Sequence, residues 1–236
     1  MKTAVFSGTS DGRELCKFLA ANGHNVSAYV ATGYGASLMG GLTVHAGRLD
    51  AAEMAAAISD CDIVIDATHP YATEVTKNIR AACSETGVRY LRLAREETVY
   101  DSCVTASDAK SAAAYLKNTH GKIFVTTGSK ELADFEAIGD RVTARVLDTV
   151  EVREKCADMA IDYIMYKMPP YSYEDNLKDF EGFRYLVTKD SGIAGGTDEK
   201  LRAAKTLGMT VIMIERPDEG REGYSLTELK AMLAED

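Results

Sequence analysis

The first group of residues that could do chemistry is a loop of small and polar residues between Ser7 and Gly12. Its hydroxyls and glycines are groups that a phosphate-binding loop uses, and Arg13 could offset the charge of Asp11. The G-x-x-x-G spacing differs from the dinucleotide fingerprint G-x-G-x-x-G, and Asp11 with Glu14 has the spacing of a helix capping box, which would compete with phosphate. A phosphate site and a capped helix without a ligand both fit this pattern. The candidate cofactor-binding residues are Gly8, Thr9, Ser10, Asp11, Gly12 and Arg13.

The same loop also matches G-x-S-x-G, the nucleophile elbow of serine hydrolases, with Ser10 as the candidate nucleophile. An elbow of this kind needs earlier strands and an oxyanion loop, whereas only seven residues precede Gly8. We therefore rank a serine hydrolase below a nucleotide-binding protein.

A second candidate group, Thr68, His69 and Tyr71, follows the apolar run Ile63-Val64-Ile65. A continuous apolar run of this length is typical of a strand buried on both faces of a parallel sheet. Pro70 favours an extended backbone at His69 and can begin the next helix, so these side chains are presented at the carboxyl edge of the sheet. His69 is interpreted either as a structural histidine or as a functional one beside the ligand crevice.

A third group lies late in the chain, where Lys189 is followed by a loop with three glycines. Consecutive backbone N–H groups beside a lysine form an anion site, and glycines are costly in a loop without a function. We interpret this loop as a ligand site ahead of a helix that Thr197 caps. Its candidate residues are Ser191, Gly192, Gly195 and Gly196.

The sequence does not decide which nicotinamide dinucleotide would bind. A Rossmann unit for NAD places an acidic residue near the end of its second strand, and one for NADP places an Arg there. The predicted strand from Asn25 to Thr32 ends with neither, and Thr32 and Ser37 are weak substitutes. Arg48 is the first nearby cation, and it is either a solvated loop residue or the group that meets adenine or a 2′-phosphate.

These groups all need the same support, a parallel sheet whose strands alternate with helices. Short apolar runs alternate with segments of helical periodicity along the chain, which predicts the α/β class. The pattern pauses at a charged stretch from Arg95 to Thr105, and Lys122 to Leu132 then repeats the strand, loop and helix of the opening segment. We therefore predict two Rossmann-like domains with parallel sheets, residues 1–97, which would bind the dinucleotide, and residues 98–236.

Composition narrows the classes of protein. The chain has 236 residues, of which 46% are hydrophobic, as in an ordinary globular protein. Its net charge of −9 argues against nucleic acid or anionic membranes as partners. Its five cysteines are an odd number without a C-x-x-C pair, which predicts reduced thiols, no metal site and a cytoplasmic location. No apolar run approaches the ~18 residues of a membrane span, and the start of the chain does not resemble a signal peptide.

A set of short motifs occurs in order over nearly the whole chain: Ser7–Leu15, Gly47–Asp50, Asp66–Ala72, Tyr90–Leu93, Val125–Ser129, Lys189–Gly192 with Gly195 and Gly196, and Val211–Pro217. Together they resemble the precorrin-6A reductase family of cobalamin biosynthesis. The resemblance implies two Rossmann-like domains with NADPH or NADH and a tetrapyrrole substrate, precorrin-6A or its cobalt complex, in the cleft between them. It implies reduction of one macrocycle double bond, by hydride transfer to one carbon and protonation of its neighbour.

The implied reaction needs positioning more than a nucleophile, because hydride transfer requires the nicotinamide at contact distance from the acceptor carbon. The candidate catalytic residues, as proton donors, are His69, Tyr71 and Lys189, with water as a competitor. Thr68 would join the cofactor site. The acetate and propionate groups of the macrocycle would call for cations near strand ends. The candidates are Arg92, Arg95, Lys130, Lys167, Lys189 and Arg216.

One departure from the family pattern concerns the segment after Arg92. The family commonly continues this strand with Arg-Pro and an aromatic residue, whereas here Arg95 is followed by two glutamates and the chain has no tryptophan. Two alternatives to the reductase stay open, a nucleotide-sensing module without turnover and the hydrolase that uses Ser10. The sequence does not indicate an oligomeric state.

Overall fold

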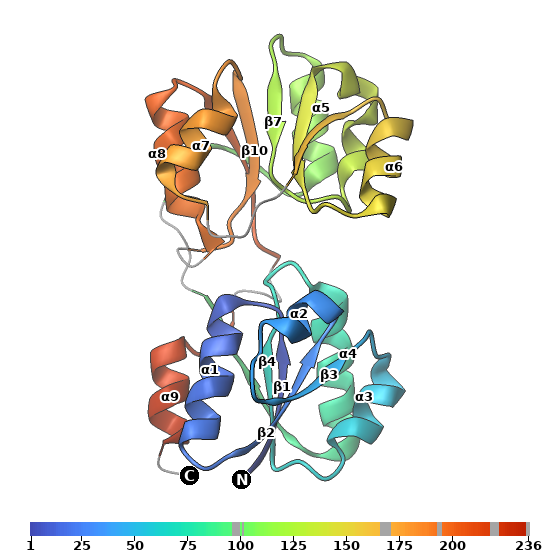
Figure 1. Cartoon of the computed structure of the whole chain (residues 1–236), viewed down its shortest axis with the longest axis vertical. Coiled ribbons are helices and arrows are strands. Elements are labelled where there is room, and N and C mark those ends of the chain that lie inside the picture. Colours follow the sequence, from blue (N-terminus) through green and yellow to red (C-terminus); the bar gives the residue numbers. More distant parts are fainter. Residues whose placement is uncertain (96–99, 101, 166–170, 193–194, 218–221, 235–236) are drawn as a thin grey trace. The chain divides into compact units, whose positions relative to one another are not determined.

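The computed structural model describes the whole chain except residues 96–99, 101, 166–170, 193–194, 218–221 and 235–236. The chain forms two compact units (Figure 1): unit 1 comprises Met1–Glu96 and Pro217–Asp236, and unit 2 comprises Glu97–Arg216. Each unit is an α/β structure with its own parallel sheet, as the alternating pattern predicts. The predicted second domain, residues 98–236, is wrong at its end, because the last segment belongs to unit 1.

The sheet of unit 1 consists of β1 (Lys2–Ser7), β2 (Asn25–Val30), β3 (Thr43–Ala46), β4 (Ile63–Ala67) and β5 (Arg89–Arg92). Over the described residues the strand order is β3-β2-β1-β4-β5, and every neighbouring pair is parallel. Val5 in the central strand pairs with Ala28 on one side and Ile65 on the other, and all three side chains are buried. The continuous apolar run of β4 is thus explained by burial on both faces.

Helices cover both faces of this sheet (Figure 1): α1 (Ser10–Ala21) and α9 (Leu226–Leu233) cover one face, and α3 (Ala51–Ile58) and α4 (Thr73–Thr86) cover the other. Val5 lies in one apolar cluster with Leu15 and Leu229, whereas the next residue, Phe6, lies in the other cluster with Ile79. This alternation follows from the two-residue period of a strand.

The end of the chain belongs to unit 1 for a reason of packing. Leu229 and Leu233 of α9 are buried in the same cluster as Leu19 of α1, and the Lys230 ammonium pairs with Glu14 (Nζ to Oε1, 2.6 Å). A helix this short is not stable by itself and needs a partner face. The sequence predicts the helix but does not indicate which of the two sheets it packs against.

The sheet of unit 2 consists of β6 (Val104–Ala106), β7 (Ile123–Val125), β8 (Val142–Val146), β9 (Asp162–Met165), β10 (Tyr185–Lys189) and β11 (Thr210–Ile214). Over the described residues its order is β6-β11-β10-β7-β8-β9, again parallel. Its helices are α5 (Ala109–Lys117), the 3-10 helix η1 (Leu132–Arg141), α6 (Val150–Asp158), α7 (Tyr173–Phe180) and α8 (Thr197–Thr206). Neither β6 nor α7 is predicted by the sequence pattern. The strand β6 begins within the charged stretch and has only three residues, too few for a periodic signal.

The two sheets share one plan. In unit 1 the chain runs from β1 outward to β2 and β3 and then returns to the other side of β1 at β4, and in unit 2 it runs from β7 to β8 and β9 and then returns at β10. The strand order therefore reverses between β1 and β4 and between β7 and β10. Ligands of open α/β sheets bind outside the carboxyl ends of the strands at such a switch point.

Candidate functional site

The loops after β1 and β4 meet at the switch point of unit 1. The N–H of Gly8 donates to the carbonyl of Ala67 (3.3 Å), which joins the residue after β1 to the last residue of β4. A Cβ added at Gly8 would lie 3.6 Å from the backbone nitrogen of His69 and 3.7 Å from the Cα of Thr68. The glycine loop and the segment Thr68–Tyr71 therefore lie side by side at one edge of the sheet, as predicted.

The N-terminus of α1 is capped by Thr9 and not by Asp11. The Thr9 hydroxyl accepts a hydrogen bond from the N–H of Gly12 (3.0 Å) and donates to the carbonyl of Ala67 (3.1 Å). The predicted capping box that starts at Asp11 is therefore wrong. The N–H groups of Ser10 and Asp11 precede the first hydrogen bond within the helix, so they lie where helix N-termini bind anions.

Arg95 supplies the charge that balances Asp11. Its Nε lies 2.6 Å from Asp11 Oδ2, and its Nη2 donates to the Ser10 hydroxyl (2.9 Å). From the sequence, Arg13 is a candidate for this role and Arg95 is a candidate ligand of substrate carboxylates. Because the side chain of Arg95 is 8% exposed and paired with Asp11, it neutralises the acidic residue in the first turn of α1. That neutralisation favours an anionic ligand at the helix end.

The same contacts argue against Ser10 as a nucleophile. In the part of the chain that the structure describes, the Ser10 hydroxyl donates to Asp11 Oδ1 (3.1 Å) and accepts from Arg95, and no histidine contacts it. A serine nucleophile needs a general base within hydrogen-bond reach. The geometry therefore does not favour the hydrolase.

Behind the segment Thr68–Tyr71 lies a buried ion pair that the sequence analysis missed. Asp66 near the end of β4 and Arg92 at the end of β5 are register partners, and Asp66 Oδ1 lies 2.5 Å from Arg92 Nη1. Their side chains are 0% and 3% exposed. Arg92 is therefore wrong as a predicted ligand of substrate carboxylates, because it is enclosed with a carboxylate of its own chain. The signal in the sequence was an aspartate directly after three strand residues expected to be buried.

His69 and Tyr71 lie together in the turn after β4. The backbone N–H of Tyr71 donates to His69 Nδ1 (3.4 Å), and the two ring centroids are 5.6 Å apart. Since Nδ1 accepts this hydrogen bond, a neutral His69 carries its proton on Nε2. The carbonyl of His69 accepts from the N–H of Ala72 (2.8 Å), which closes the turn. Both side chains are half-buried.

The predicted ribose end of the site lies after β2 and β3. The segment after β2 is the short helix α2 (Gly33–Ser37), and the Thr32 hydroxyl caps it by accepting from the N–H of Gly35 (3.1 Å). Arg48 follows β3 and is exposed. The N–H of Gly47 donates to the carbonyl at the end of β2 (2.9 Å), so the start of this loop lies beside the strand end where a Rossmann unit holds its ribose.

Two cation–carboxylate pairs hold the switch point of unit 2. Lys189 Nζ lies 2.5 Å from Glu131 Oε1 and donates to the carbonyl of Thr127 (3.3 Å), which ties β10 to the loop after β7. Arg216 Nε lies 3.0 Å from Asp190 Oδ2 and donates to the carbonyl of the same residue (3.0 Å). Lys189 and Arg216, predicted to meet the substrate, thus form ion pairs within unit 2.

Some N–H groups of the glycine loop after β10 donate hydrogen bonds to side chains of the same segment. The N–H of Gly192 donates to Asp190 Oδ1 (3.0 Å), and the N–H of Ser191 donates to the Thr197 hydroxyl (3.1 Å). Gly196 precedes α8 with a φ of 71°, a left-handed conformation that glycine adopts without strain. The cofactor role of Ser191, Gly192, Gly195 and Gly196 stays a prediction.

Comparison with protein families identifies the chain. Residues 2–234 match the family described as Precorrin-6x reductase CbiJ/CobK. The chain belongs to this reductase family. The cobalt-precorrin-6A reductase of Salmonella typhimurium is 33% identical over 98% of this chain and 93% of that protein, and the one of Priestia megaterium is 33% identical over 90% and 89%.

A solved structure of this family has the same fold. The CobK precorrin-6A reductase superposes with a TM-score of 0.85 and 26% identity, covering 100% of this chain and 97% of that one. The family, the α/β fold with two parallel sheets and the assignment as an oxidoreductase of cobalamin biosynthesis are thus confirmed. Within the described ranges no helix is long and apolar enough to cross a membrane, and no cluster of His, Cys, Asp or Glu is placed to hold a metal ion.

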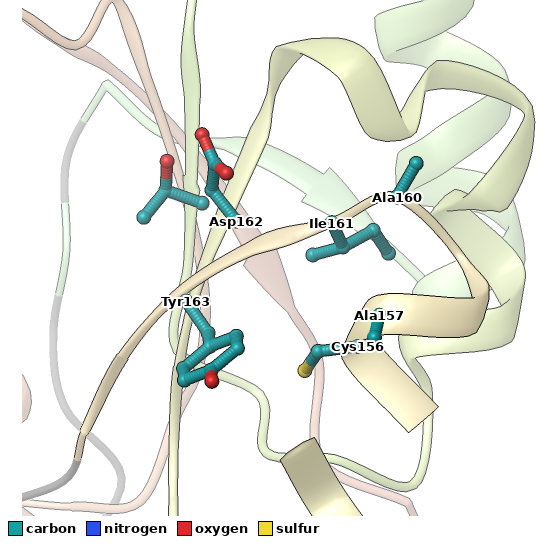
Figure 2. A pocket seen from close by; sticks show the side chains of 7 residues that line it. Cys156, Ala157, Ala160, Ile161, Asp162 and Tyr163 are labelled. Atoms are coloured by element: carbon teal, nitrogen blue, oxygen red, sulfur yellow. The ribbon is translucent and has the colours of Figure 1, made fainter. Parts of the chain in front are cut away.

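This member of the reductase family also has a pocket in unit 2, away from the strand ends that carry the loops. The pocket has a volume of about 710 Å³ and lies between α6 and β9, lined by Thr143, Cys156, Ala157, Ala160, Ile161, Asp162 and Tyr163. Figure 2 shows it from close by. Thr143 and Asp162 lie at the amino ends of β8 and β9, opposite the switch point. Burial raises the pKa of the Cys156 thiol, which makes it a poor nucleophile. Because the pocket lies at the amino ends of the strands, whereas ligands of open α/β sheets bind outside the carboxyl ends, it does not compete with the switch points as the reaction site.

Lys200 in the first turn of α8 gives a prediction about stability. It is buried, its Nζ donates to the Thr188 hydroxyl (3.0 Å), and burial, with the charge of Arg145, lowers its pKa to about 8 from the usual 10.5. Between these two pH values the unfolded chain binds more protons than the folded one, so this group makes stability rise with pH. We expect the stability gained by Lys200→Met relative to wild type to be ~3 kcal/mol larger at pH 7 than at pH 10.5.

Urea unfolding followed by far-UV circular dichroism at both pH values measures this difference. The charge of every other group changes equally in the two proteins and cancels. A difference between variant and wild type that is the same at both pH values would show that Lys200 titrates normally.

Proposed function

We propose that this chain reduces one double bond of precorrin-6A or its cobalt complex with a hydride from NADPH. The observation that carries the proposal is the switch point of unit 1, where the N-terminus of α1, the exposed Gly8 and the half-buried His69 occur at one sheet edge. Membership of the reductase family supplies the chemistry. The nucleotide-sensing alternative predicts the same binding edge without turnover.

The residues at this edge fit the phosphates of a dinucleotide. Gly8 is exposed, and without a Cβ its backbone can be approached closely by a ligand. The N–H groups of Ser10 and Asp11 would donate to a phosphate, while Arg95 keeps the Asp11 carboxylate from repelling it. When bound, the reduced nicotinamide supplies the hydride. The protein holds the dinucleotide in place, which is the main requirement of a hydride transfer.

We assign the proton that completes the reduction to His69. Its Nε2 is the nitrogen that carries the proton in the neutral ring, because Nδ1 accepts from Tyr71. Its place beside the glycine loop brings it to the predicted dinucleotide site. Tyr71 packs against the same ring and is the second candidate. Lys189 is less suited, since its ammonium is paired with Glu131.

Among the predicted ligands of substrate carboxylates, Lys130 is the best placed of the described residues. It is exposed in the loop after β7, at the switch point of unit 2. Arg92, Arg95, Lys189 and Arg216 are paired with carboxylates of the chain itself. Lys167 lies outside the described residues. An exposed ammonium at a strand end suits a propionate or acetate group.

An anaerobic turnover assay tests the function. Purified protein receives precorrin-6A or its cobalt complex with NADPH or NADH, and loss of reduced-nicotinamide absorbance is followed. We expect oxidation that depends on the tetrapyrrole, with NADPH preferred. Dinucleotide binding without oxidation in the presence of either macrocycle would reject the reductase and favour the sensing module.

The preference for NADPH depends on Arg48 in this proposal. We expect Arg48→Ala to weaken NADPH binding about tenfold and to leave NADH binding unchanged, because only NADPH carries the 2′-phosphate that an arginine would meet. Isothermal titration with both dinucleotides measures this. Arg89→Ala is the matched control, an exposed arginine at the opposite end of the same sheet. Equal weakening of both dinucleotides would remove Arg48 from the 2′-phosphate site.

A further inference from the structure

We propose that the buried Asp66–Arg92 pair is a positioning device that fixes the turn carrying His69, and that it acts through Thr68. The inference rests on the proposed function, since it concerns the turn that would present the proton donor. It also changes the role of Thr68, which the sequence analysis placed among the residues that contact the cofactor.

Every polar atom of Thr68 is bonded to this pair. Its hydroxyl donates to Asp66 Oδ1 (2.7 Å) and accepts from Arg92 Nη1 (2.9 Å). Its N–H donates to Asp66 Oδ1 (3.0 Å), and its carbonyl accepts from Arg92 Nη2 (3.3 Å). A threonine hydroxyl has one proton to donate, and Asp66 takes it. Thr68 therefore faces the interior and sets the direction in which the chain enters His69.

The pair also ties the turn to the elements around it. The Thr76 hydroxyl in α4 donates to Asp66 Oδ2 (2.8 Å) and accepts from Arg92 Nη1 (3.2 Å). The Tyr90 hydroxyl in β5 donates to the same carboxylate oxygen (3.2 Å). The carboxylate thus joins β4, β5 and the start of α4, so the turn between β4 and α4 is held at both of its ends.

The energetics favour a positioning role over a purely stabilising one. Removing two charges from water costs several kcal/mol each, and a buried pair often stabilises a fold no more than apolar residues of the same size would. Over the described residues, Arg92 Nε is buried and lacks a hydrogen-bond partner, so the pair is not even fully satisfied. The contribution of the pair is to orient the turn, because its hydrogen bonds define one conformation of Thr68.

The conformation of Thr68 determines the position of His69 because the backbone between them is short and restricted. Thr68 precedes His69 in the chain, and Pro70 limits the backbone of His69 to extended conformations. The hydrogen bonds from Tyr71 to His69 Nδ1 and from Ala72 to the His69 carbonyl then close the turn. An altered Thr68 would therefore move the imidazole relative to the glycine loop beside it.

Thr68→Val and Thr68→Ser test the inference in the full-length enzyme. Valine keeps the shape of threonine and loses the hydroxyl, whereas serine keeps the hydroxyl. We expect Thr68→Val to lower kcat at least tenfold with the KM for NADPH changed less than twofold, and Thr68→Ser to stay within threefold of wild type. We also expect faster amide hydrogen exchange in the peptide 66–72 of Thr68→Val. A kcat for Thr68→Val within twofold of wild type would overturn the inference.

Thr3→Val is the matched control. Thr3 is a buried threonine of the same sheet whose hydroxyl is bonded to His24 Nδ1 (3.1 Å) at the amino end of β1. A loss of kcat in Thr3→Val as large as in Thr68→Val would mean that the effect is general destabilisation, which rejects positioning. Hydrogen exchange separates this inference from the function: if the wild type does not turn over, the proposed function fails, and unchanged exchange in Thr68→Val would reject the positioning role independently.

Discussion

Replacing Arg92 by methionine is expected to lower the free energy of unfolding by about 3–5 kcal/mol. The substitution leaves the Asp66 carboxylate, which is 0% exposed, without the guanidinium that lies 2.5 Å away. The hydroxyls of Thr68, Thr76 and Tyr90 still donate to that carboxylate but carry no charge to compensate it. Urea unfolding followed by far-UV circular dichroism measures the change, and a loss below 1 kcal/mol would show that the pair is not essential to the fold.

The double substitution Asp66→Leu with Arg92→Met separates the ion pair from simple loss of packing. We expect the double variant to be more stable than Arg92→Met alone, because it removes the lone buried charge. The coupling energy of the cycle should exceed 2 kcal/mol, above the few tenths that independent sites show. Additive effects would mean that the two side chains do not act as a pair. We expect the double variant to fold but to have low activity, because the turn that carries His69 loses the hydrogen bonds that orient it.

Replacing Gly12 by alanine is expected to reduce both stability and dinucleotide binding. Its Cβ would lie 2.8 Å from Ser7 Oγ and 2.9 Å from the Cβ of Ala67, closer than such atoms approach. The helix α1 would have to move away from the ends of β1 and β4, and overpacking of this kind costs about 1–3 kcal/mol. The N–H groups at the helix end would move with it. We expect at least tenfold weaker NADPH binding by isothermal titration and a lower midpoint of thermal unfolding.

Gly8→Ala is the matched variant, with the opposite balance of effects. A Cβ at Gly8 meets nothing closer than 3.6 Å, so the fold should tolerate it with a change of less than about 0.5 kcal/mol. The new methyl group would stand on the exposed loop that a phosphate must approach closely. We expect about tenfold weaker NADPH binding without a change in the unfolding midpoint. Unchanged binding in Gly8→Ala would place the phosphates elsewhere.

Local patterns in the sequence predict much of the fold. The apolar run at Ile63-Val64-Ile65 identifies a central strand because a strand buried on both faces has no polar positions to spare. The glycine loop before α1 and the Thr68–Tyr71 segment were predicted at the same sheet edge, and the hydrogen bond from Gly8 to Ala67 joins them there. Parallel strands place their carboxyl ends at one edge, so strand direction suffices for this inference.

The partners of the site residues did not follow from local patterns. The spacing allowed a helix cap at Asp11, with Arg13 to offset its charge, whereas Thr9 takes the capping position and Arg95 comes from the segment after β5. The pairing of Asp66 with Arg92 depends on the register between β4 and β5. Register is a property of two strands together, and one strand's sequence does not contain it.

The order of short motifs along the sequence indicated the reductase family. The sequence by itself also determined the two parallel sheets and the loops at which their switch points lie, because strand and helix periodicities and glycine positions are local. Only the tertiary structure decided which charges are free to meet a ligand. Arg92 and Arg216 resemble any cation at a strand end until the fold encloses each of them with an aspartate. It also decided that α9 completes unit 1, because a short amphipathic helix is placed by the apolar face that it covers and not by its position in the chain.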